Sequence, residues 1–118
     1  MKHFEELIIW KESRLLVNEI YKISRKTNDF GFKDQIQRAA ISVMNNIAEG
    51  AESGTDASFI KYLNIAKASC AEVRSMLYLS EDFNIIDTDK AALLRNNTIT
   101  ISSRIFQLIQ YLKKSITK

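Results

Sequence analysis

The chain contains no proline and only three glycines in 118 residues. Proline and glycine are the residues that most often end helices and shape the turns between strands. A sheet protein of this length would need many more turn residues, whereas long helices need few. This scarcity of turn residues predicts an all-α fold.

Apolar residues recur at alternating steps of three and four, which places their side chains on one face of an α-helix. The clearest stripe consists of Phe59, Leu63, Ala66, Cys70, Val73 and Leu77. Weak breaks between the stripes predict four helices, at about residues 4–26, 32–53, 55–83 and 88–116. Short connections make consecutive helices antiparallel neighbours. We therefore expect one domain, residues 1–118, folded as an antiparallel up-down-up-down four-helix bundle.

Two positions within these helices need an explanation. Residues 98–102 read Thr-Ile-Thr-Ile-Ser, a β-branched alternation typical of a strand. We predict helix there because the longer spacing of three and four runs through the segment. Gly50 lies inside the second helix, where glycine lowers the stability of the helix by about 1 kcal/mol relative to alanine. Gly50 therefore requires a packing reason or marks a bend.

Cysteine usage and hydropathy indicate the compartment. Cys70 is the only cysteine, so an internal disulfide is impossible, and a reducing cytoplasm fits this composition. The N-terminus lacks the apolar stretch of a signal peptide. No apolar run exceeds four residues, so we expect no membrane span.

The residue types needed for most catalytic and metal sites are missing. His3 is the single histidine, and it precedes the first core residue. Di-iron bundles need Glu-x-x-His pairs on facing helices, and a Ser-His or Cys-His nucleophile would have to recruit His3. Cys70 lies on a core stripe and is expected to be inert. We therefore predict no enzyme, no metal and no cofactor.

One polar constellation remains. Its members on the second helix share a face, and these are Arg38, Ser42, Asn45 and Glu49, with Asn46 adjoining. Ser69 and Glu72 lie near the main stripe of the third helix. The constellation is either a ligand or catalytic site, or a hydrogen-bonded network at a helix or subunit interface in which Arg38 offsets a glutamate. We favour the network, because carboxylates without histidine, cysteine or metal partners are usually structural.

Basic residues gather near the C-terminus. Residues 90–118 carry six basic side chains and no acidic one, on a chain of net charge +3. Such asymmetry indicates a polyanionic partner. A basic strip on the fourth helix contains a tyrosine that could stack on a base, and it consists of Arg104, Gln107, Tyr111, Lys114 and Lys118. Basic residues ending the first helix should lie beside Lys90 and Arg95. The candidate nucleic-acid-binding residues are Lys22, Arg25, Lys26, Arg95, Arg104, Tyr111, Lys113, Lys114 and Lys118. Alternatively, these lysines complement helix dipoles and maintain solubility.

Apolar residues outside the core stripes form a second set. They either widen the core or meet another subunit, because contiguous exposed apolar surface marks association. We favour association for part of the set. The candidate interface residues are Trp10, Val17, Tyr21, Phe106 and Ile109.

The residues above resemble a bacterial family of small four-helix-bundle proteins, named for open reading frames in intervening sequences of 23S ribosomal RNA genes. The signature is Gln37-Arg38-Ala39-Ala40, Ser42-Val43 and Asn46-Ile47-Ala48-Glu49-Gly50, followed by Phe59, residues 62–66, Ser69 and Glu72. Ala68 replaces a common glycine, and Ser53 replaces an arginine that often follows the signature.

The resemblance implies homopentameric rings and no established enzymatic activity. A looser similarity connects the family to the accessory bundle protein of diversity-generating retroelements, which partners a reverse transcriptase and binds nucleic acid. The leading hypothesis is thus a non-enzymatic oligomeric scaffold that binds RNA or DNA, beside an RNA-processing or reverse-transcribing enzyme. The alternative is a structural protein–protein adaptor that binds no nucleic acid.

Overall fold

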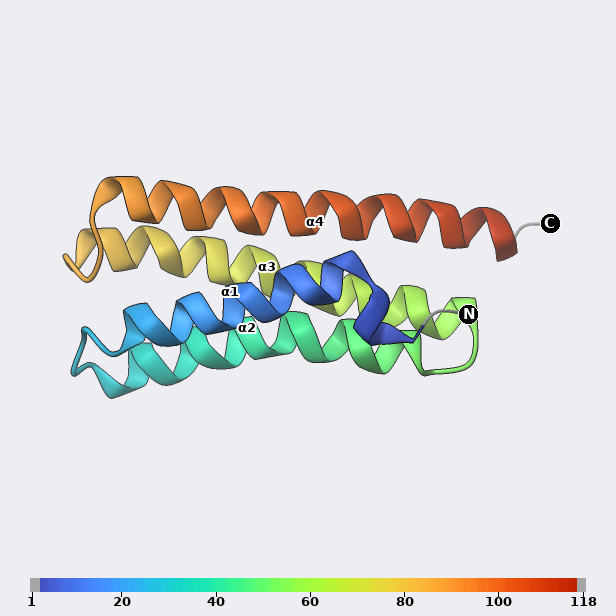
Figure 1. Cartoon of the computed structure of the whole chain (residues 1–118), viewed down its shortest axis with the longest axis horizontal. Coiled ribbons are helices and arrows are strands. Elements are labelled where there is room, and N and C mark those ends of the chain that lie inside the picture. The colour runs from blue at the N-terminus through green and yellow to red at the C-terminus, as the bar shows by residue number, and fades with distance from the viewer. Residues whose placement is uncertain (1–2, 117–118) are drawn as a thin grey trace.

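A computed structural model of the chain, which describes residues 3–116, shows a four-helix bundle (Figure 1). A 3₁₀ turn η1 and four α-helices follow one another: η1 Phe4–Glu6, α1 Ile8–Ser24, α2 Phe30–Ala51, α3 Asp56–Asp82 and α4 Thr88–Ile116. The prediction of an all-α bundle is confirmed. Within the described residues, no helix is long and apolar enough to cross a membrane.

The helices form a closed square in chain order. Each helix packs against its neighbours in the sequence, and α4 returns to pack against α1 (Figure 1). The α2–α3 contact is the most extensive and the α1–α4 contact the thinnest. The bundle measures 50 × 21 × 20 Å. Its edges therefore differ, with a tight α2–α3 side facing away from a loose α1–α4 side.

The first predicted helix is interrupted at Leu7. Leu7 is extended, with φ −75° and ψ 129°, so the chain changes direction between η1 and α1. The rings of Phe4 and Trp10 pack edge to face across this turn, with centroids 5.2 Å apart. η1 contacts α1 and α2, so the N-terminal segment leans towards α2 (Figure 1). This change of direction leaves the last turns of α4 without α1 beside them.

Side-chain caps set the starts of the other helices. The Asp29 carboxylate accepts a hydrogen bond from the Phe32 amide at 3.1 Å, so α2 begins two residues before the predicted start. Thr55 and Asp87 cap the next two helices, accepting from the amides of Ser58 at 3.1 Å and Lys90 at 2.7 Å. These oxygens satisfy amides that have no partner in the first helical turn.

The core contains a few polar side chains, and four of them bond to carbonyls of their own helix. The hydroxyls of Ser13, Ser24 and Ser80 donate to carbonyls four residues earlier in their own helices. Thr98 donates to the Arg95 carbonyl at 2.6 Å and is fully buried. Residues 98–102 are helical, as predicted, because Thr98 and Ile101 belong to the buried stripe of α4. Tertiary burial here outweighs β-propensity.

Gly50 is required by close packing of α2 on α3. A Cβ atom at this position would lie 2.8 Å from Tyr62 Cβ and 2.9 Å from Phe59 Cδ1. Both contacts are shorter than carbon atoms tolerate, and Tyr62 Cβ cannot move without its backbone. The packing reason expected for this glycine is therefore present.

We predict that Gly50→Ala destabilises the protein by about 1–3 kcal/mol, because overpacking outweighs the better helix propensity of alanine. Urea denaturation of the two proteins measures the difference. Gly31→Ala is the matched control, since a Cβ there would meet only Asp29 Oδ1 at 3.8 Å. Equal stability of Gly50→Ala and the wild type would contradict the packing argument.

An ion pair joins α1 to α4. Lys90 Nζ donates to Glu19 Oε2 at 3.1 Å, and Lys22 Nζ lies 3.7 Å from Glu19 Oε1. The hydrogen bond from Lys90 lowers the pKa of Glu19 from its ordinary value of 4.5. The ionised carboxylate thus stabilises the fold above that ordinary pKa, and the stabilisation is lost as the pH falls through the lowered value.

We predict that Glu19→Gln lowers the free energy of unfolding at neutral pH by less than about 1 kcal/mol, as for other partly exposed pairs. The difference from wild type should vanish in strongly acidic solution, where both side chains are neutral. Thermal denaturation across an acid-to-neutral pH series measures it. A difference that stays constant with pH would refute an electrostatic origin.

Candidate interaction surfaces

The polar constellation lies mainly at the α2–α3 contact. The hydroxyl oxygens of Ser42 and Ser69 are 2.8 Å apart. Asn46 Nδ2 donates to the Ser42 carbonyl at 2.8 Å and to its hydroxyl oxygen at 3.0 Å. Gln35 Nε2 donates to Glu72 Oε2 at 3.2 Å, further along the same seam. The Ser42–Ser69 and Gln35–Glu72 bonds join the two helices, on the same seam as the close approach at Gly50 but further from the α2–α3 connection.

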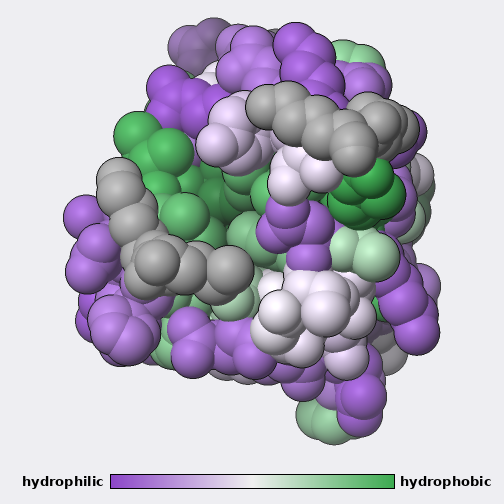
Figure 2. Space-filling model, turned by 90° about the vertical axis from the view of Figure 1, so that its right-hand side faces the viewer, coloured by the Kyte–Doolittle hydropathy of each residue, from purple (hydrophilic) through white to green (hydrophobic). Residues whose placement is uncertain are grey.

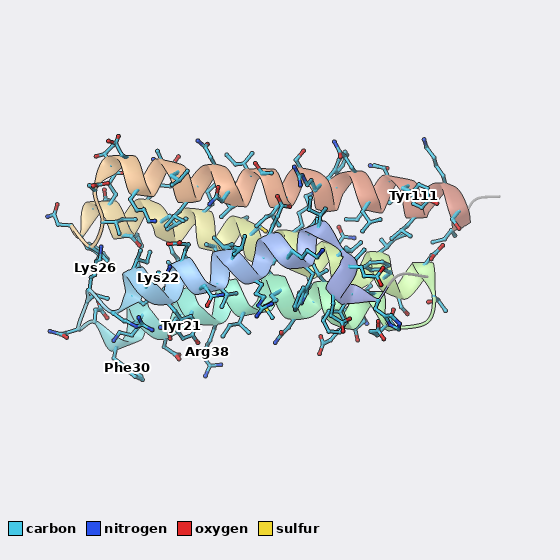
Figure 3. The ribbon with its side chains drawn as sticks, in the orientation of Figure 1. Tyr21, Lys22, Lys26, Phe30, Arg38 and Tyr111 are labelled. Carbon is cyan, nitrogen blue, oxygen red and sulfur yellow. The ribbon has the colours of Figure 1, made fainter. Side chains whose placement is uncertain are left out.

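Arg38 does not take part in this network. Its Nε donates to Asp34 Oδ2 at 2.9 Å within α2, and the side chain is 79% exposed (Figure 3). The expectation that Arg38 offsets a glutamate is therefore wrong, because Arg38 pairs with Asp34, one turn earlier in the same helix. Glu49 is also exposed. The signature residues thus divide into a helix–helix network and two solvent-facing charges.

Cys70 lies fully buried in the core. Desolvation raises the pKa of its thiol to about 12, with the charge of Arg74 opposing the shift. The thiol is therefore protonated at neutral pH and is a poor nucleophile. Among residues 3–116, no three His, Cys, Asp or Glu side chains form a group suited to a metal ion.

The candidate nucleic-acid-binding residues separate into two groups. Lys22 and Lys26 lie at the end where α1 turns into α2, and Tyr111 lies near the opposite end (Figure 3). Arg25 shares the first end, and Lys113 and Lys114 follow Tyr111. Lys118 lies outside the described residues. The bundle is 50 Å long, so the two groups are separate surfaces.

Acidic residues offset much of the first group. As expected from the topology, the end of α1 meets the start of α4, where Lys22 and Lys90 share Glu19. Arg95 Nη1 lies 3.0 Å from Glu81 Oε1, its guanidinium stacks 4.1 Å from the Tyr78 ring centroid, and its side chain is only 16% exposed. Arg95 is therefore a link between α3 and α4 and offers little surface to a ligand.

Three residues of the basic strip predicted on α4, which are Arg104, Gln107 and Tyr111, line a groove. The α1–α4 groove consists of three hollows that follow α4, two on its seam with α1 and a third beyond the start of α1, where Leu7 and the ends of α2 and α3 form the other wall. The first hollow, of about 190 Å³, is lined by Glu12, Leu15, Leu16, Glu19, Asn97, Thr100 and Ile101. The second, of about 560 Å³, is lined by Leu7, Ile8, Ile9, Arg104, Gln107 and Leu108. The third, of about 510 Å³, is lined by Leu7, Ala51, Asp56, Phe59, Tyr111, Leu112 and Ser115.

The character of this groove is more apolar than basic. Arg104 Nη1 lies 3.1 Å from Glu12 Oε2, so its charge is matched by a carboxylate on α1. At the end that carries both termini, Figure 2 shows apolar surface exposed in a recess bordered by hydrophilic residues. The groove is wide at this end because η1 leans towards α2 and leaves α4 uncovered.

The candidate interface residues lie on two opposite edges of the bundle. On α1, Trp10, Val17 and Tyr21 follow helical spacing on the flank away from the α4 contacts, which is the side of α2. We name these three residues the α1–α2 apolar edge. On α4, Phe106 faces α3, where Lys67 Nζ lies 5.1 Å from its ring centroid.

A second edge follows from the position of Phe106. Ile99 is exposed on the same flank of α4, between Arg95 and Phe106, and Tyr78 of α3 is exposed nearby. We name Tyr78, Ile99 and Phe106 the α3–α4 apolar edge. Ile109 does not belong to either edge. It is 3% exposed and lies in the core, so the prediction that it meets another subunit is wrong.

Sequence reasoning missed several residues of the groove. Ile8 and Leu15 are 56% and 67% exposed, and Glu12 lies between them. The sequence contained a signal for Ile8 and Leu15, because two apolar residues seven positions apart occupy one face of a helix, here outside the core stripe. The partners of Glu12 and Glu19 on α4 had no signal, since they depend on which helices become neighbours.

Comparison with known proteins gives the family and the fold. A crystal structure of a protein of unknown function from the S23 ribosomal protein family of Bacteroides thetaiotaomicron aligns with a TM-score of 0.81 and 23% identity. The alignment covers 86% of this chain and 98% of that protein, and it shows a shared fold. None of the curated proteins matches significantly. The model of the 23S rRNA-intervening sequence proteins matches residues 5–107. The chain therefore belongs to the 23S rRNA-intervening sequence protein family.

Proposed function

We propose that the protein is a non-enzymatic scaffold that assembles into a closed homo-oligomer. The observation that carries this proposal is the pair of apolar edges on opposite sides of one small bundle, in which Trp10 and Val17 are partly buried and the other four side chains are exposed. The α1–α2 apolar edge includes Tyr21, and the α3–α4 apolar edge includes Phe106, both of them exposed. A soluble monomer rarely exposes extended apolar surface unless it binds something.

Two different edges favour a particular kind of symmetry. A two-fold dimer buries the same patch on both subunits, whereas a head-to-tail contact joins two different patches. Repeated head-to-tail contacts form a ring when the rotation closes, and every apolar edge is then covered. The pentamer implied by the family resemblance is a ring of this kind, and we adopt it as the proposed state.

The polar residues also fit a scaffold better than an enzyme. The hydroxyls of Ser42 and Ser69 bond across the α2–α3 contact, and Asn46 bonds to Ser42 within α2. Their hydrogen-bonding groups are used to hold the bundle together, and Arg38 is paired outside this network. This arrangement supports a structural role for the signature.

Nucleic-acid binding is the second candidate function. It is supported by Tyr111, which is 70% exposed and followed by Lys113 and Lys114 near the end of α4. An exposed aromatic ring beside basic residues is suited to a single-stranded nucleic acid. A ring would repeat this small surface around its axis, so weak contacts would add.

The first prediction of the proposal concerns assembly. We expect Tyr21→Glu and Phe106→Glu each to dissociate the oligomer, because a charge is placed on an apolar contact. Mixing the two variants should then produce heterodimers, since each subunit retains the edge that its partner lacks. Native mass spectrometry measures all three states.

The control for assembly is Leu79→Glu, which adds the same charge at an exposed leucine on the outer face of α3. This variant should remain oligomeric, and circular dichroism should show all three variants folded. A monomeric wild type at micromolar concentration would overturn the proposal. Mixed variants that stay monomeric would exclude head-to-tail contact between these edges.

The second prediction concerns nucleic acid. We expect single-stranded RNA or DNA to bind at low salt, with affinity that falls steeply as salt is added and depends little on sequence. The double variant Lys113→Glu and Lys114→Glu should weaken binding more than tenfold, because contacts to phosphates are replaced by repulsion. Fluorescence anisotropy measures the affinity.

Lys22→Glu with Lys26→Glu is the matched control at the opposite end of the bundle. It should change the affinity little, because carboxylates such as Glu19 already offset charge there. If the wild-type protein binds neither RNA nor DNA at low salt, the scaffold acts through protein contacts alone.

A further inference from the structure

The α1–α4 groove has the dimensions of a site for an elongated ligand. Its hollows extend along α4 from Asn97 to Ser115, or about 27 Å at 1.5 Å per residue. Leu7 borders both the second and the third hollow, so these two hollows adjoin. A helix of about five turns has this length.

Apolar side chains stand on the rim of the groove. Ile8 and Leu15, both more than half exposed, line the second and the first hollow. Seven residues separate them, so they are two turns apart on one face of α1. Tyr111 extends the rim at the far end, on the wall formed by α4. This spacing matches the apolar face of an amphipathic helix, whose anchors recur every three or four residues.

One polar group in the groove lacks a partner. Glu12 uses Oε2 to pair with Arg104, but its Oε1 is buried and accepts no hydrogen bond from any described residue. A buried acceptor without a donor destabilises the fold, because it has lost its hydrogen bonds to water. Glu12 lines the first hollow, so a group bound there lies beside its carboxylate. A cationic donor entering from the groove would satisfy it.

We propose that the α1–α4 groove binds an amphipathic helix of a partner protein, and that a lysine or arginine on this helix bonds to Glu12. The apolar face of the helix covers Ile8, Leu15 and Tyr111, and its cation completes the half-satisfied carboxylate. Nucleic acid fits this groove poorly, because Glu12 and Glu19 would repel phosphates.

This inference goes beyond the proposed self-assembly and does not depend on it. The two apolar edges lie on the α1–α2 and α3–α4 sides of the square, whereas the groove lies on the α1–α4 side. A ring built through the two edges therefore leaves one groove free on each subunit. The fourth side is closed by the polar α2–α3 network.

The test uses a phage-displayed library of helices of about five turns, with leucines fixed on one face and all other positions varied. The wild-type protein selects binders, and the folded Leu15→Glu variant removes those that do not need the groove. We expect enriched helices to carry lysine or arginine at one central position beside the leucines. Synthetic peptides with these sequences are then titrated by fluorescence anisotropy.

A double-mutant cycle identifies the contact with Glu12. Glu12→Gln in the protein and lysine-to-glutamine in the peptide should each weaken binding about tenfold, because a charge-assisted bond is lost. The two changes together should cost little more than either alone. Glu49→Gln and Leu79→Glu, both at exposed positions away from the groove, are the matched controls and should not alter the affinity.

Three outcomes would overturn the inference. Enrichment of no helix, or of helices without a central cation, would exclude the proposed partner. Additive losses in the cycle would exclude the contact with Glu12. Dissociation of the homo-oligomer by Leu15→Glu would show that a second copy occupies the groove. Tyr21→Glu and Phe106→Glu should still bind the peptide, which separates this inference from the fate of the proposed assembly.

Discussion

The close packing of α2 on α3 determines how the rest of the bundle is arranged. Gly50 lets the two backbones approach, and the hydroxyls of Ser42 and Ser69 meet in the same seam. A polar contact of this kind has one register, because the oxygens bond only when they are opposite each other. α1 and α4 then pack on the outer sides of this pair. Their own contact is left thin, and the groove arises there.

Ion pairs within the bundle reduce the number of basic side chains that are available to a ligand. By composition, α4 is the most basic element of the chain. In the bundle, Arg95 pairs with Glu81 of α3, and Arg104 pairs with Glu12 of α1. Their guanidinium groups hold helices together and are less available to phosphates. The exposed basic surface is therefore smaller than the charge of α4 indicates. Exposed apolar side chains occupy the rim of the groove and the two apolar edges.

The helical architecture could be predicted because burial leaves a regular imprint on the sequence. The stripe predicted from Phe59 to Leu77 is buried in the core, and Thr98 is buried on α4 despite its β-branched side chain. The break at Leu7 escaped prediction, because no proline or glycine marks it and it depends on packing between Phe4 and Trp10. Ile109 was assigned to the second apolar set because it follows Phe106 by three residues. The structure buries Ile109 and leaves Leu108 partly buried, because a shift of one position around a helix decides burial.

The sequence by itself determined the number of helices, the face of each that is buried, and the positions where chemistry is missing. These properties are local, since they follow from helical spacing and from residue types along the chain. Only the tertiary structure decided that Arg38 pairs with Asp34, that Glu12 is half satisfied, and that the apolar residues divide between two edges. Each of these depends on which helices are neighbours and at what rotation, and side chains far apart in the sequence meet only once the bundle has formed.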